Sequence, residues 1–279
     1  MITNPNVKIN LGLNVLRKRG DGFHDLETLF VPYFNISDTL EIVVGDDYSR
    51  TSAAIFGKYA PEMIAQGISE DGKLMITIAR KEGVDWDPLK DLTAKAYYVL
   101  SEEFDMPPVK IFLEKNSPVG AGLGGGSADA AFALKMLNEL CGLGLDEERL
   151  AGYASRLGSD CAFFIYNRPM IGEGRGEILS EYSICLDGYD LQVLTPEGVA
   201  VSTKDAYGGI RPHLPEVSLK EALARPVEEW DGVLVNDFEE TVFAKYPELA
   251  AIKRSLYDSG AAYASMSGSG SALFALYKA

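Results

Sequence analysis

The stretch Pro118-Val-Gly-Ala-Gly-Leu-Gly-Gly-Gly-Ser-Ala-Asp-Ala-Ala131 places five glycines and a serine where a strand gives way to a helix. Upstream, residues 109–115 have the β-branched and aromatic content of a strand. Downstream, apolar residues recur at intervals of three and four over residues 131–141, which predicts a helix ending near Gly142. Glycines let main-chain N–H groups approach a ligand, and the first turn of a helix adds unpaired N–H groups with a partial positive charge. The stretch therefore predicts a phosphate-binding loop.

Two other phosphate-binding motifs fit this stretch poorly. A P-loop requires a lysine and a Ser or Thr directly after its last glycine, whereas Gly126 is followed by Ser127 and Ala128. Residues 120–125 match the dinucleotide fingerprint by letters, but that fold requires a return to a parallel strand and an acid about 20 residues further on. Residues 146–156 have the pattern of a second helix instead. A glycine-rich turn without a ligand, before a helix capped by Ser127, is the structural alternative.

The composition favours a two-domain protein and argues against a nucleic-acid-binding or membrane-binding one. The chain has 279 residues, 47% of them hydrophobic, and is long enough for two domains with their own cores. It carries 41 acidic and 26 basic residues, and its net charge of −15 argues against a nucleic-acid or anionic membrane surface. A polyanionic ligand would need oriented amides, a few lysines and a divalent cation.

The cysteines and the start of the chain indicate the compartment. Cys141, Cys161 and Cys185 are odd in number and widely spaced, so we expect reduced, packed thiols rather than a disulfide framework or a metal site. The first residues show no basic segment followed by an apolar run, and no apolar stretch approaches the ~18 residues of a membrane span. We therefore expect a cytoplasmic protein.

The amino-terminal strand and the hairpin after it contain further candidates. Apolar and polar side chains alternate over residues 6–16, which predicts a strand with Lys8 and Asn10 on one face. Lys8 is either a solvated lysine on an edge strand or a residue with a partner elsewhere in the chain. Phe23 and His24 follow a basic hairpin. They could stack on and hydrogen-bond a planar base, although an exposed histidine beside a core phenylalanine explains them equally.

Two later segments also allow two interpretations each. Asp160 lies at a predicted helix end before the apolar residues 161–166, and is either a cap or turn residue or a partly desolvated proton acceptor. Ser267-Gly-Ser-Gly-Ser271 lies between two predicted strands, and is either a hairpin turn or a second set of phosphate-binding amides. Residues 211–231 contain prolines and acidic residues and are expected on the surface.

Four separated segments together resemble the GHMP kinases, the small-molecule kinases named for galactokinase, homoserine, mevalonate and phosphomevalonate kinases. The segments are residues 5–11, 118–127, 158–160 with the apolar run that follows, and 266–271. The resemblance covers nearly the whole chain and implies an α+β fold of two domains. These would be an ATP-binding N-terminal domain (residues 1–156) and a substrate-binding C-terminal domain (residues 157–279), with the active site in the cleft between them.

Within the family, three stretches are similar to a branch that phosphorylates the C2 hydroxyl of a cytidine diphosphate-linked methylerythritol, in the non-mevalonate route to isoprenoid precursors. The stretches are residues 19–30, 157–164 and 172–177. The resemblance implies ATP as co-substrate and Mg²⁺ as helper. A homoserine or mevalonate kinase of the family should lack the hairpin at residues 22–24. A nucleotide-binding protein without activity would need neither Lys8 nor Asp160.

The resemblance assigns the catalytic and ATP-binding roles. Lys8 and Asp160 match the catalytic pair of the family. Asp160 would accept the proton of the attacking hydroxyl, while Lys8 would lower the pKa of that hydroxyl and keep Asp160 ionised. The matched ATP-binding positions are Pro118, Gly120, Gly122, Leu123, Gly124, Gly125, Gly126, Ser127, Ala128 and, toward the adenine, Lys95. Ser127 could also support the metal ion or a phosphate oxygen.

The substrate positions and the departures from the family follow from the same resemblance. Asn10 would hydrogen-bond the methylerythritol part, and His24 matches a histidine that recognises cytosine. Phe23 stands where tyrosine is usual, so stacking on the base is kept and a hydroxyl contact is lost. Asp91 stands where asparagine is common, near the adenine. Asp129 adds negative charge beside the loop, which suits the helix dipole but opposes phosphate unless Mg²⁺ intervenes.

Overall fold

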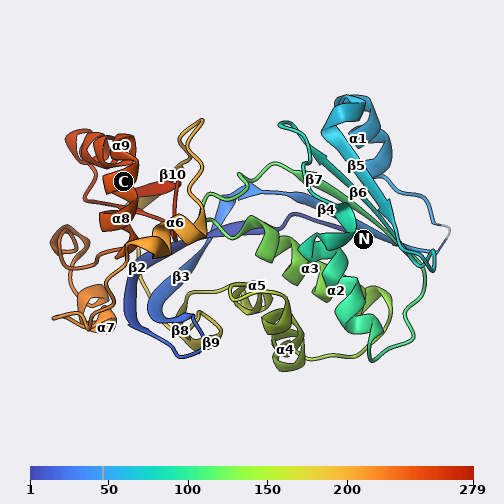
Figure 1. The fold of residues 1–279 in the computed structure, drawn as a ribbon, viewed down its shortest axis with the longest axis horizontal. Coiled ribbons are helices and arrows are strands. Elements are labelled where there is room, and N and C mark those ends of the chain that lie inside the picture. Colours follow the sequence, from blue (N-terminus) through green and yellow to red (C-terminus); the bar gives the residue numbers. More distant parts are fainter. Residues whose placement is uncertain (46) are drawn as a thin grey trace. The chain divides into compact units, whose positions relative to one another are not determined.

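The computed structural model describes residues 1–45 and 47–279, and the chain forms two compact units (Figure 1). Unit 1 consists of residues 1–7, 33–119 and 124–167, and unit 2 of residues 8–32, 120–123 and 168–279. Each unit is thus assembled from three segments, whereas the predicted domains 1–156 and 157–279 are continuous. The chain changes unit within the long strands β2 (Asn6–Lys18) and β3 (His24–Ser37). The family's domain boundary and the cleft between the domains stay predictions.

Unit 1 is built on a five-stranded sheet in the order β1-β4-β7-β6-β5. Its strands are β1 (Ile2–Thr3), β4 (Thr39–Val44), β5 (Ile64–Ile68), β6 (Leu74–Arg80) and β7 (Val109–Lys115). The pairs are antiparallel except β6 with β7, which run parallel. The β-branched and aromatic residues of β6 and β7 are buried on both faces, as expected for central strands covered on both sides.

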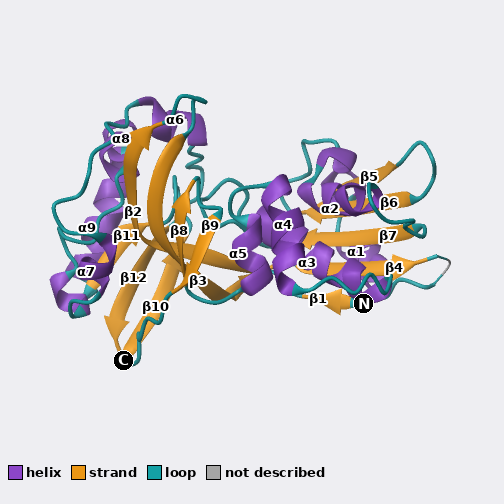
Figure 2. Cartoon of the chain, turned by 90° about the horizontal axis from the view of Figure 1, so that it is seen from below, coloured by secondary structure: helices purple, strands orange, loops and turns teal. Residues whose placement is uncertain are grey.

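Helices cover both faces of this sheet. Helix α1 (Thr51–Lys58) packs on one face through Ile55, against Val43 and Phe112, while α2 (Leu92–Ser101) and α3 (Gly125–Leu140) lie on the other (Figure 1). Helices α4 (Glu147–Leu157) and α5 (Cys161–Tyr166) pack against α3 (Figure 2). Short 3-10 helices span Pro61–Met63 and Pro88–Lys90.

The ends of α3 test two sequence predictions. The helix ends at Leu140, and Gly142 follows with a φ of +62°, so the predicted stop is confirmed. The prediction that Ser127 caps the helix is wrong. Gly124 occupies the cap position at a φ of +73°, which a residue without a Cβ adopts readily, and the helix therefore begins before Ser127.

Unit 2 contains a four-stranded sheet and a three-stranded sheet. The first has the order β2-β3-β8-β9, and β8 (Met170–Gly174) and β9 (Ile178–Glu181) form an antiparallel hairpin. The second has the antiparallel order β10-β12-β11, from β10 (Tyr189–Leu194), β11 (Tyr263–Met266) and β12 (Leu273–Lys278). Its helices are α6 (Thr203–Gly208), α7 (Leu219–Leu223), α8 (Phe238–Lys245) and α9 (Pro247–Asp258), with a 3-10 turn at Val227–Glu229.

Two interpretations fail in unit 2. Residues 211–231 do not lie wholly on the surface, because Leu219 and Trp230 are buried and α7 begins in a capping box between Ser218 and Glu221. Strand β2 does lie at the edge of its sheet, but Lys8 is only 2% exposed, so the solvated-lysine interpretation is wrong.

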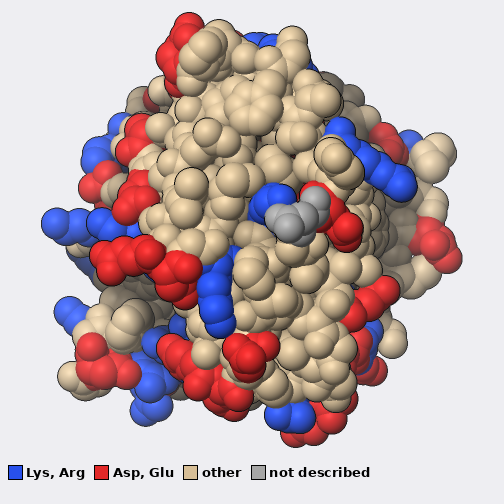
Figure 3. Space-filling view, turned by 90° about the vertical axis from the view of Figure 1, so that its right-hand side faces the viewer, with Lys and Arg blue, Asp and Glu red and all other residues tan. Residues whose placement is uncertain are grey.

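The charged surface, the helices and the cysteines can be compared with what the composition led us to expect. Figure 3 shows acidic and basic side chains interspersed over one face of the molecule. Among residues 1–45 and 47–279, no helix has the length and apolar character needed to cross a bilayer. The cytoplasmic location stays a prediction. The cysteines are free thiols as predicted, yet Cys185 is exposed, so the expectation that all three are packed is wrong.

Candidate active site

The glycine loop, residues 118–127, has a backbone suited to an anion. Gly120, Gly122 and Gly124 have φ values of +73°, +76° and +73°, and the side chains of Ala121 and Leu123 between them are buried. Left-handed residues that alternate with ordinary ones turn successive N–H groups toward one side, which creates an anion-binding concavity. The first turn of α3 follows directly and adds its unpaired N–H groups.

The loop positions differ in exposure. Those that are exposed or half-buried are Pro118, Gly120, Gly122, Gly124, Gly126 and Ser127, while Leu123, Gly125 and Ala128 are buried. A Cβ on Gly125 would lie 2.4 Å from the Ser117 hydroxyl, so this glycine is needed for close packing behind the loop.

In unit 1 the end of the loop lies near the segment that leads into α5. A Cβ on Gly158 would lie 3.9 Å from the Ser127 hydroxyl and 3.1 Å from the Cys161 sulfur. Burial raises the pKa of the Cys161 thiol to about 12. The preceding residue, Asp160, occupies the helix-cap position, but its carboxylate makes no capping hydrogen bond within the part of the chain that the structure describes. The cap interpretation of Asp160 therefore lacks its defining contact.

In unit 2 the loop contacts Lys8. The Lys8 ammonium donates to the Gly122 carbonyl at 2.8 Å and to Asn10 Oδ1 at 2.5 Å, so Lys8 and Asn10 share a face as predicted. The Asn10 side chain in turn donates to the Thr28 hydroxyl at 3.0 Å. The Lys8 backbone N–H also donates to the Leu123 carbonyl at 3.0 Å. These contacts join β2 to the middle of the loop.

The Ser/Gly tip, residues 267–271, packs on the same part of the loop. The Ser267 hydroxyl donates to the Gly122 carbonyl at 3.1 Å, and a Cβ on Gly122 would lie 2.2 Å from the Ser267 carbonyl oxygen. Within the tip, the N–H groups of Ser267 and Gly270 donate to the carbonyls of Ala272 and Ser267. The tip thus supports the glycine loop, while a second set of phosphate-binding amides stays a prediction.

The two residues expected at a base-binding site have different surroundings. Phe23 is 53% exposed, and the Arg175 guanidinium lies over its ring at 5.0 Å. His24 is half-buried and stacks on Tyr207, with ring centroids 4.8 Å apart. Burial and the charge of Lys18 lower the pKa of His24, which favours the neutral imidazole at pH 7. A neutral ring both donates and accepts hydrogen bonds.

Near the predicted adenine site, Asp91 has a local role. Its carboxylate accepts hydrogen bonds from the Thr93 N–H at 2.8 Å and from the Trp86 indole at 3.0 Å, and it caps α2. This explains an aspartate at the position, because a carboxylate is favoured at a helix start. Lys95 is exposed on the first turns of α2, and its role toward ATP stays a prediction.

A magnesium ion would have to be held largely by phosphate. Within residues 1–45 and 47–279 no group of three or more His, Cys, Asp or Glu side chains could hold a metal ion. Mg²⁺ is typically bound by one or two protein oxygens together with substrate phosphates, so the residues present fit a nucleotide-bound ion. Ser127 is the candidate oxygen donor of the loop.

Contrary to the expectation from the sequence, Asp129 does not place its negative charge directly beside the loop. It is buried behind the first turn of α3 and paired with the Lys115 ammonium at 2.6 Å, so its charge does not meet the phosphates directly. Sequence patterns did not point to Lys115, nor to Arg175 and Tyr207 as neighbours of the expected site residues. The one available signal was a lysine ending the strand that leads into the loop.

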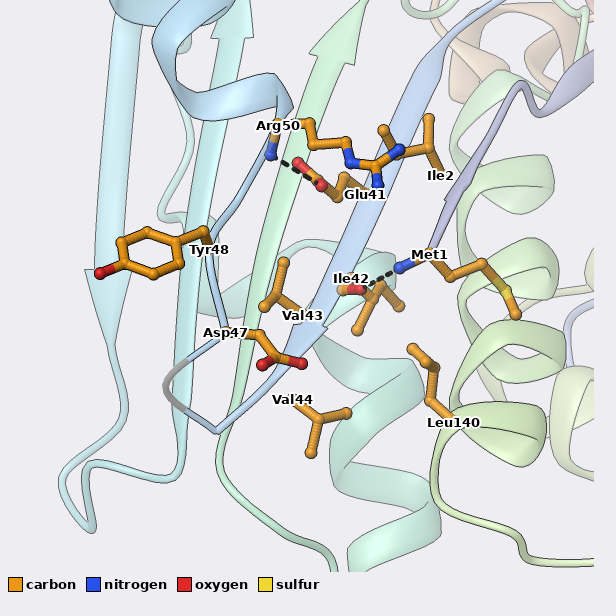
Figure 4. Close-up of a pocket in the computed structure, with 10 residues that line it drawn as sticks. All are labelled: Met1, Ile2, Glu41, Ile42, Val43, Val44, Asp47, Tyr48, Arg50 and Leu140. Carbon is orange, nitrogen blue, oxygen red and sulfur yellow. Dashed lines mark hydrogen bonds between the residues drawn. The ribbon is translucent and has the colours of Figure 1, made fainter.

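A cavity of about 710 Å³ in unit 1 lies elsewhere. Its lining includes Met1, Glu41 and Arg50, and also Leu140 at the end of α3 (Figure 4). A helix of 16 residues is about 24 Å long, so Leu140 lies far from the glycine loop at the other end of α3. Glu41 accepts hydrogen bonds from the Arg50 and Thr51 N–H groups at 2.9 and 2.7 Å and thus serves the start of α1.

Two family models and several curated relatives match this chain. The models of the GHMP kinases N terminal domain and the GHMP kinases C terminal match residues 91–168 and 219–279. A 4-diphosphocytidyl-2-C-methyl-D-erythritol kinase of Bacteroides fragilis is 48% identical over 277 residues, covering 99% of this chain and 92% of that relative. The enzyme of the same name from Bacteroides thetaiotaomicron is 46% identical over 278 residues, covering 100% of this chain and 92% of its own length.

A solved structure extends the agreement to the fold. The crystal structure of a 4-(cytidine 5'-diphospho)-2C-methyl-D-erythritol kinase matches with a TM-score of 0.74 and 29% identity, covering 99% of this chain and 90% of that one. The α+β fold expected from the sequence is therefore confirmed. The chain belongs to the GHMP kinase family and, within it, groups with the 4-diphosphocytidyl-2-C-methyl-D-erythritol kinases.

Proposed function

We propose that this chain transfers the terminal phosphoryl group of ATP to the C2 hydroxyl of 4-diphosphocytidyl-2-C-methyl-D-erythritol. The observation that carries the proposal is that Lys8 contacts the loop within unit 2, while the segment that contains Asp160 lies beside the loop within unit 1. Lys8 donates to Gly122, and the Ser127 hydroxyl lies near Gly158 and Cys161, which flank Asp160 in the sequence. A catalytically silent nucleotide-binding protein would not require this arrangement.

The proposed chemistry is proton removal combined with charge stabilisation. Asp160 accepts the proton of the C2 hydroxyl as the hydroxyl oxygen bonds to the γ-phosphorus, while the bond from that phosphorus to the bridging oxygen of the β-phosphate breaks and ADP leaves. Lys8, oriented by Asn10 and Gly122, places a positive charge that favours the developing alkoxide and the ionised Asp160. Phosphoryl transfer depends mainly on positioning and charge neutralisation, so two preset side chains beside a phosphate loop suit this reaction.

The proposed nucleotide site is the glycine loop with the first turn of α3. Its amides hold the β- and γ-phosphates, and Lys95 reaches the adenine end. Mg²⁺, when bound, cancels phosphate charge, and Ser127 is the candidate protein ligand. The residues of the loop bind and orient the polyphosphate whether or not the metal is held by a protein oxygen.

The proposed alcohol site uses the residues of unit 2. The exposed ring of Phe23 stacks on cytosine, and the neutral imidazole of His24 hydrogen-bonds the edge of the base. Asn10 already accepts from Lys8 and donates to Thr28, but an amide has a further lone pair and a further N–H for the methylerythritol hydroxyls.

Steady-state ADP release tests this function. The purified chain is assayed with ATP and three alcohols: the diphosphocytidyl alcohol, mevalonate and homoserine. Because a site built to hydrogen-bond a group rejects analogues that lack it, we expect kcat/KM for the diphosphocytidyl alcohol to exceed the others by roughly a hundredfold or more. A preference for mevalonate or homoserine would overturn the substrate, and nucleotide binding without ADP release from any alcohol would overturn the activity.

A further inference from the structure

Behind the glycine loop, unit 1 buries an ion-pair cluster formed by Asp38, Lys115 and Asp129. Their side chains are 1%, 4% and 1% exposed. The Lys115 ammonium donates to Asp129 Oδ2 at 2.6 Å, to Asp38 Oδ2, and to the Ser117 hydroxyl at 3.4 Å. The cluster has no part in the proton transfer proposed above. Burying three charges costs free energy unless they are fully paired, so the cluster calls for another explanation.

Asp38 fixes the chain that leads into the loop. Its Oδ1 accepts hydrogen bonds from the N–H groups of Asn116 and Ser117, both at 2.6 Å. Its Oδ2 accepts from the Ser117 hydroxyl at 2.7 Å in addition to Lys115. Four donors therefore converge on one carboxylate, and the two residues directly before Pro118 are held to the end of β3.

Asp129 fixes the other side of the loop. It lies on α3 four residues after Gly125, one turn into the helix, and its contact with Lys115 joins that turn to the end of β7. Gly125 packs directly over the cluster, since a Cβ there would lie 2.4 Å from the Ser117 hydroxyl and 3.5 Å from the Lys115 ammonium. The lysine therefore lies under the first turn of α3 and contacts residues on both sides of the loop, Ser117 before it and Asp129 after it.

The electrostatics of the cluster suit this location. Burial alone would lower the pKa of Lys115, but the charges of Asp129 and Asp38 outweigh it and raise that pKa above its usual value. Burial raises the pKa of Asp129 well above its usual value, and its Oδ1 has no hydrogen-bond partner among the described residues. Lys115 therefore stays an ammonium group that both carboxylates hold behind the loop.

We propose that Lys115 is a positioning residue for nucleotide binding. Through Asp38 and Asp129 it holds Ser117 and the first turn of α3 in the geometry that the phosphate-binding amides require. The inference rests on the proposed function only in taking ATP as the ligand of the glycine loop. It assigns the cluster to the nucleotide side of the reaction and not to the alcohol.

The Lys115→Met variant of the full chain tests the inference through the two Michaelis constants. Because a displacement of about 1 Å at a reacting group can cost roughly a hundredfold, we expect KM for ATP to rise roughly tenfold or more. KM for the diphosphocytidyl alcohol should stay within about twofold of wild type, because the expected alcohol residues lie in unit 2. Simple destabilisation would lower the active fraction and leave both constants unchanged. A folded variant with an unchanged KM for ATP would overturn the inference.

Two variants of Asp129 keep the test decisive if Lys115→Met does not fold. Asp129→Leu removes the carboxylate that joins α3 to Lys115 and leaves the Asp38 pair, so KM for ATP should rise severalfold. Asp129→Asn keeps an acceptor for Lys115 and should retain the wild-type KM. Equal KM values for ATP in the two variants would count against the inference. Lys73→Met is the matched control, because Lys73 is 43% exposed and pairs at 3.3 Å with an exposed aspartate in the same unit.

Equilibrium binding of a non-hydrolysable ATP analogue separates this inference from the proposed function. The measurement needs no alcohol, and circular dichroism reports whether each variant is folded. The dissociation constant should rise in Lys115→Met and Asp129→Leu and remain at the wild-type value in Asp129→Asn and Lys73→Met. If wild-type chain bound the analogue but phosphorylated no alcohol, the proposed function would fail while this inference was still tested.

Discussion

The glycine loop and the Ser/Gly tip have similar sequences but different supports. Both contain left-handed glycines, Gly120, Gly122 and Gly124 in the loop and Gly268 and Gly270 in the tip. The loop is followed by helix α3 and lies over the charged cluster around Lys115, whereas the tip joins two antiparallel strands. From the amino-acid sequence alone, both turns would be assigned to phosphate binding.

The tip is supported by a neutral amide. Asn236 is buried, and its Nδ2 donates to the carbonyls of Met266 and Gly268 at 2.7 and 2.9 Å, while its Oδ1 accepts from the Phe238 N–H at 3.0 Å. The tip then contributes the Ser267 hydroxyl to the loop. The loop is followed by a helix start whose unpaired amides favour an anion, whereas the tip lies between strands and hydrogen-bonds to the loop.

The largest expected effect separates binding by the loop from the chemistry beside it. Asp160→Asn should lower kcat by roughly two to four orders of magnitude, the usual contribution of a general base, and leave nucleotide affinity nearly unchanged. Asp146→Asn, at the start of α4 in the same unit, keeps a capping side chain and should retain full turnover. Single-turnover kinetics with both variants checks this, and wild-type turnover in Asp160→Asn would remove that residue from the mechanism.

A second change acts where the loop and the tip meet. Gly122→Ala forces a side chain into a left-handed conformation and against the Ser267 carbonyl, and should cost at least about 2 kcal/mol of stability while raising KM for ATP. Gly152→Ala lies in the middle of α4 with open space around it, and should stabilise the chain by up to about 1 kcal/mol. Urea unfolding of both measures the contrast, and equal stabilities would show that the contact is not tight.

Removing the amide that supports the tip should have a smaller effect on stability. Asn236→Ala leaves two buried carbonyls without their donor, and should lower the free energy of unfolding by about 1–3 kcal/mol. Asn4→Ala removes an exposed amide and should change it by less than about 0.5 kcal/mol. Thermal or urea unfolding compares the two, and a stable Asn236→Ala variant would mean that the strands alone hold the tip.

The charged support of the loop should be visible in the pH dependence of stability. Burial raises the pKa of Asp129 above its unfolded value of 3.8, so the folded chain keeps a proton that the unfolded chain releases. Stability from this group is present below pH 3.8 and is lost as the pH rises toward the raised pKa. Asp129→Asn should therefore gain stability relative to wild type as the pH rises from acidic to neutral. Parallel pH profiles of urea unfolding for the two proteins would contradict this.

The elements around the loop could be predicted because their signals are local. The strand at residues 109–115, the helix after it and the shared face of Lys8 and Asn10 follow from periodicity and glycine positions. The burial of Lys8 and the pairing of Lys115 with Asp38, 77 residues away in sequence, depend on long-range contacts that no local pattern encodes. The stacking of His24 on Tyr207 has the same origin.

The most direct test of the central claim identifies the phosphorylated atom. The chain is incubated with ATP and a ¹³C-labelled diphosphocytidyl alcohol, and the product is followed by ³¹P and ¹³C NMR. The account predicts a new phosphomonoester resonance with phosphorus coupling to C2 and its methyl carbon, while the diphosphate resonances persist. A phosphomonoester on another carbon, or unchanged alcohol with ATP intact, would contradict it.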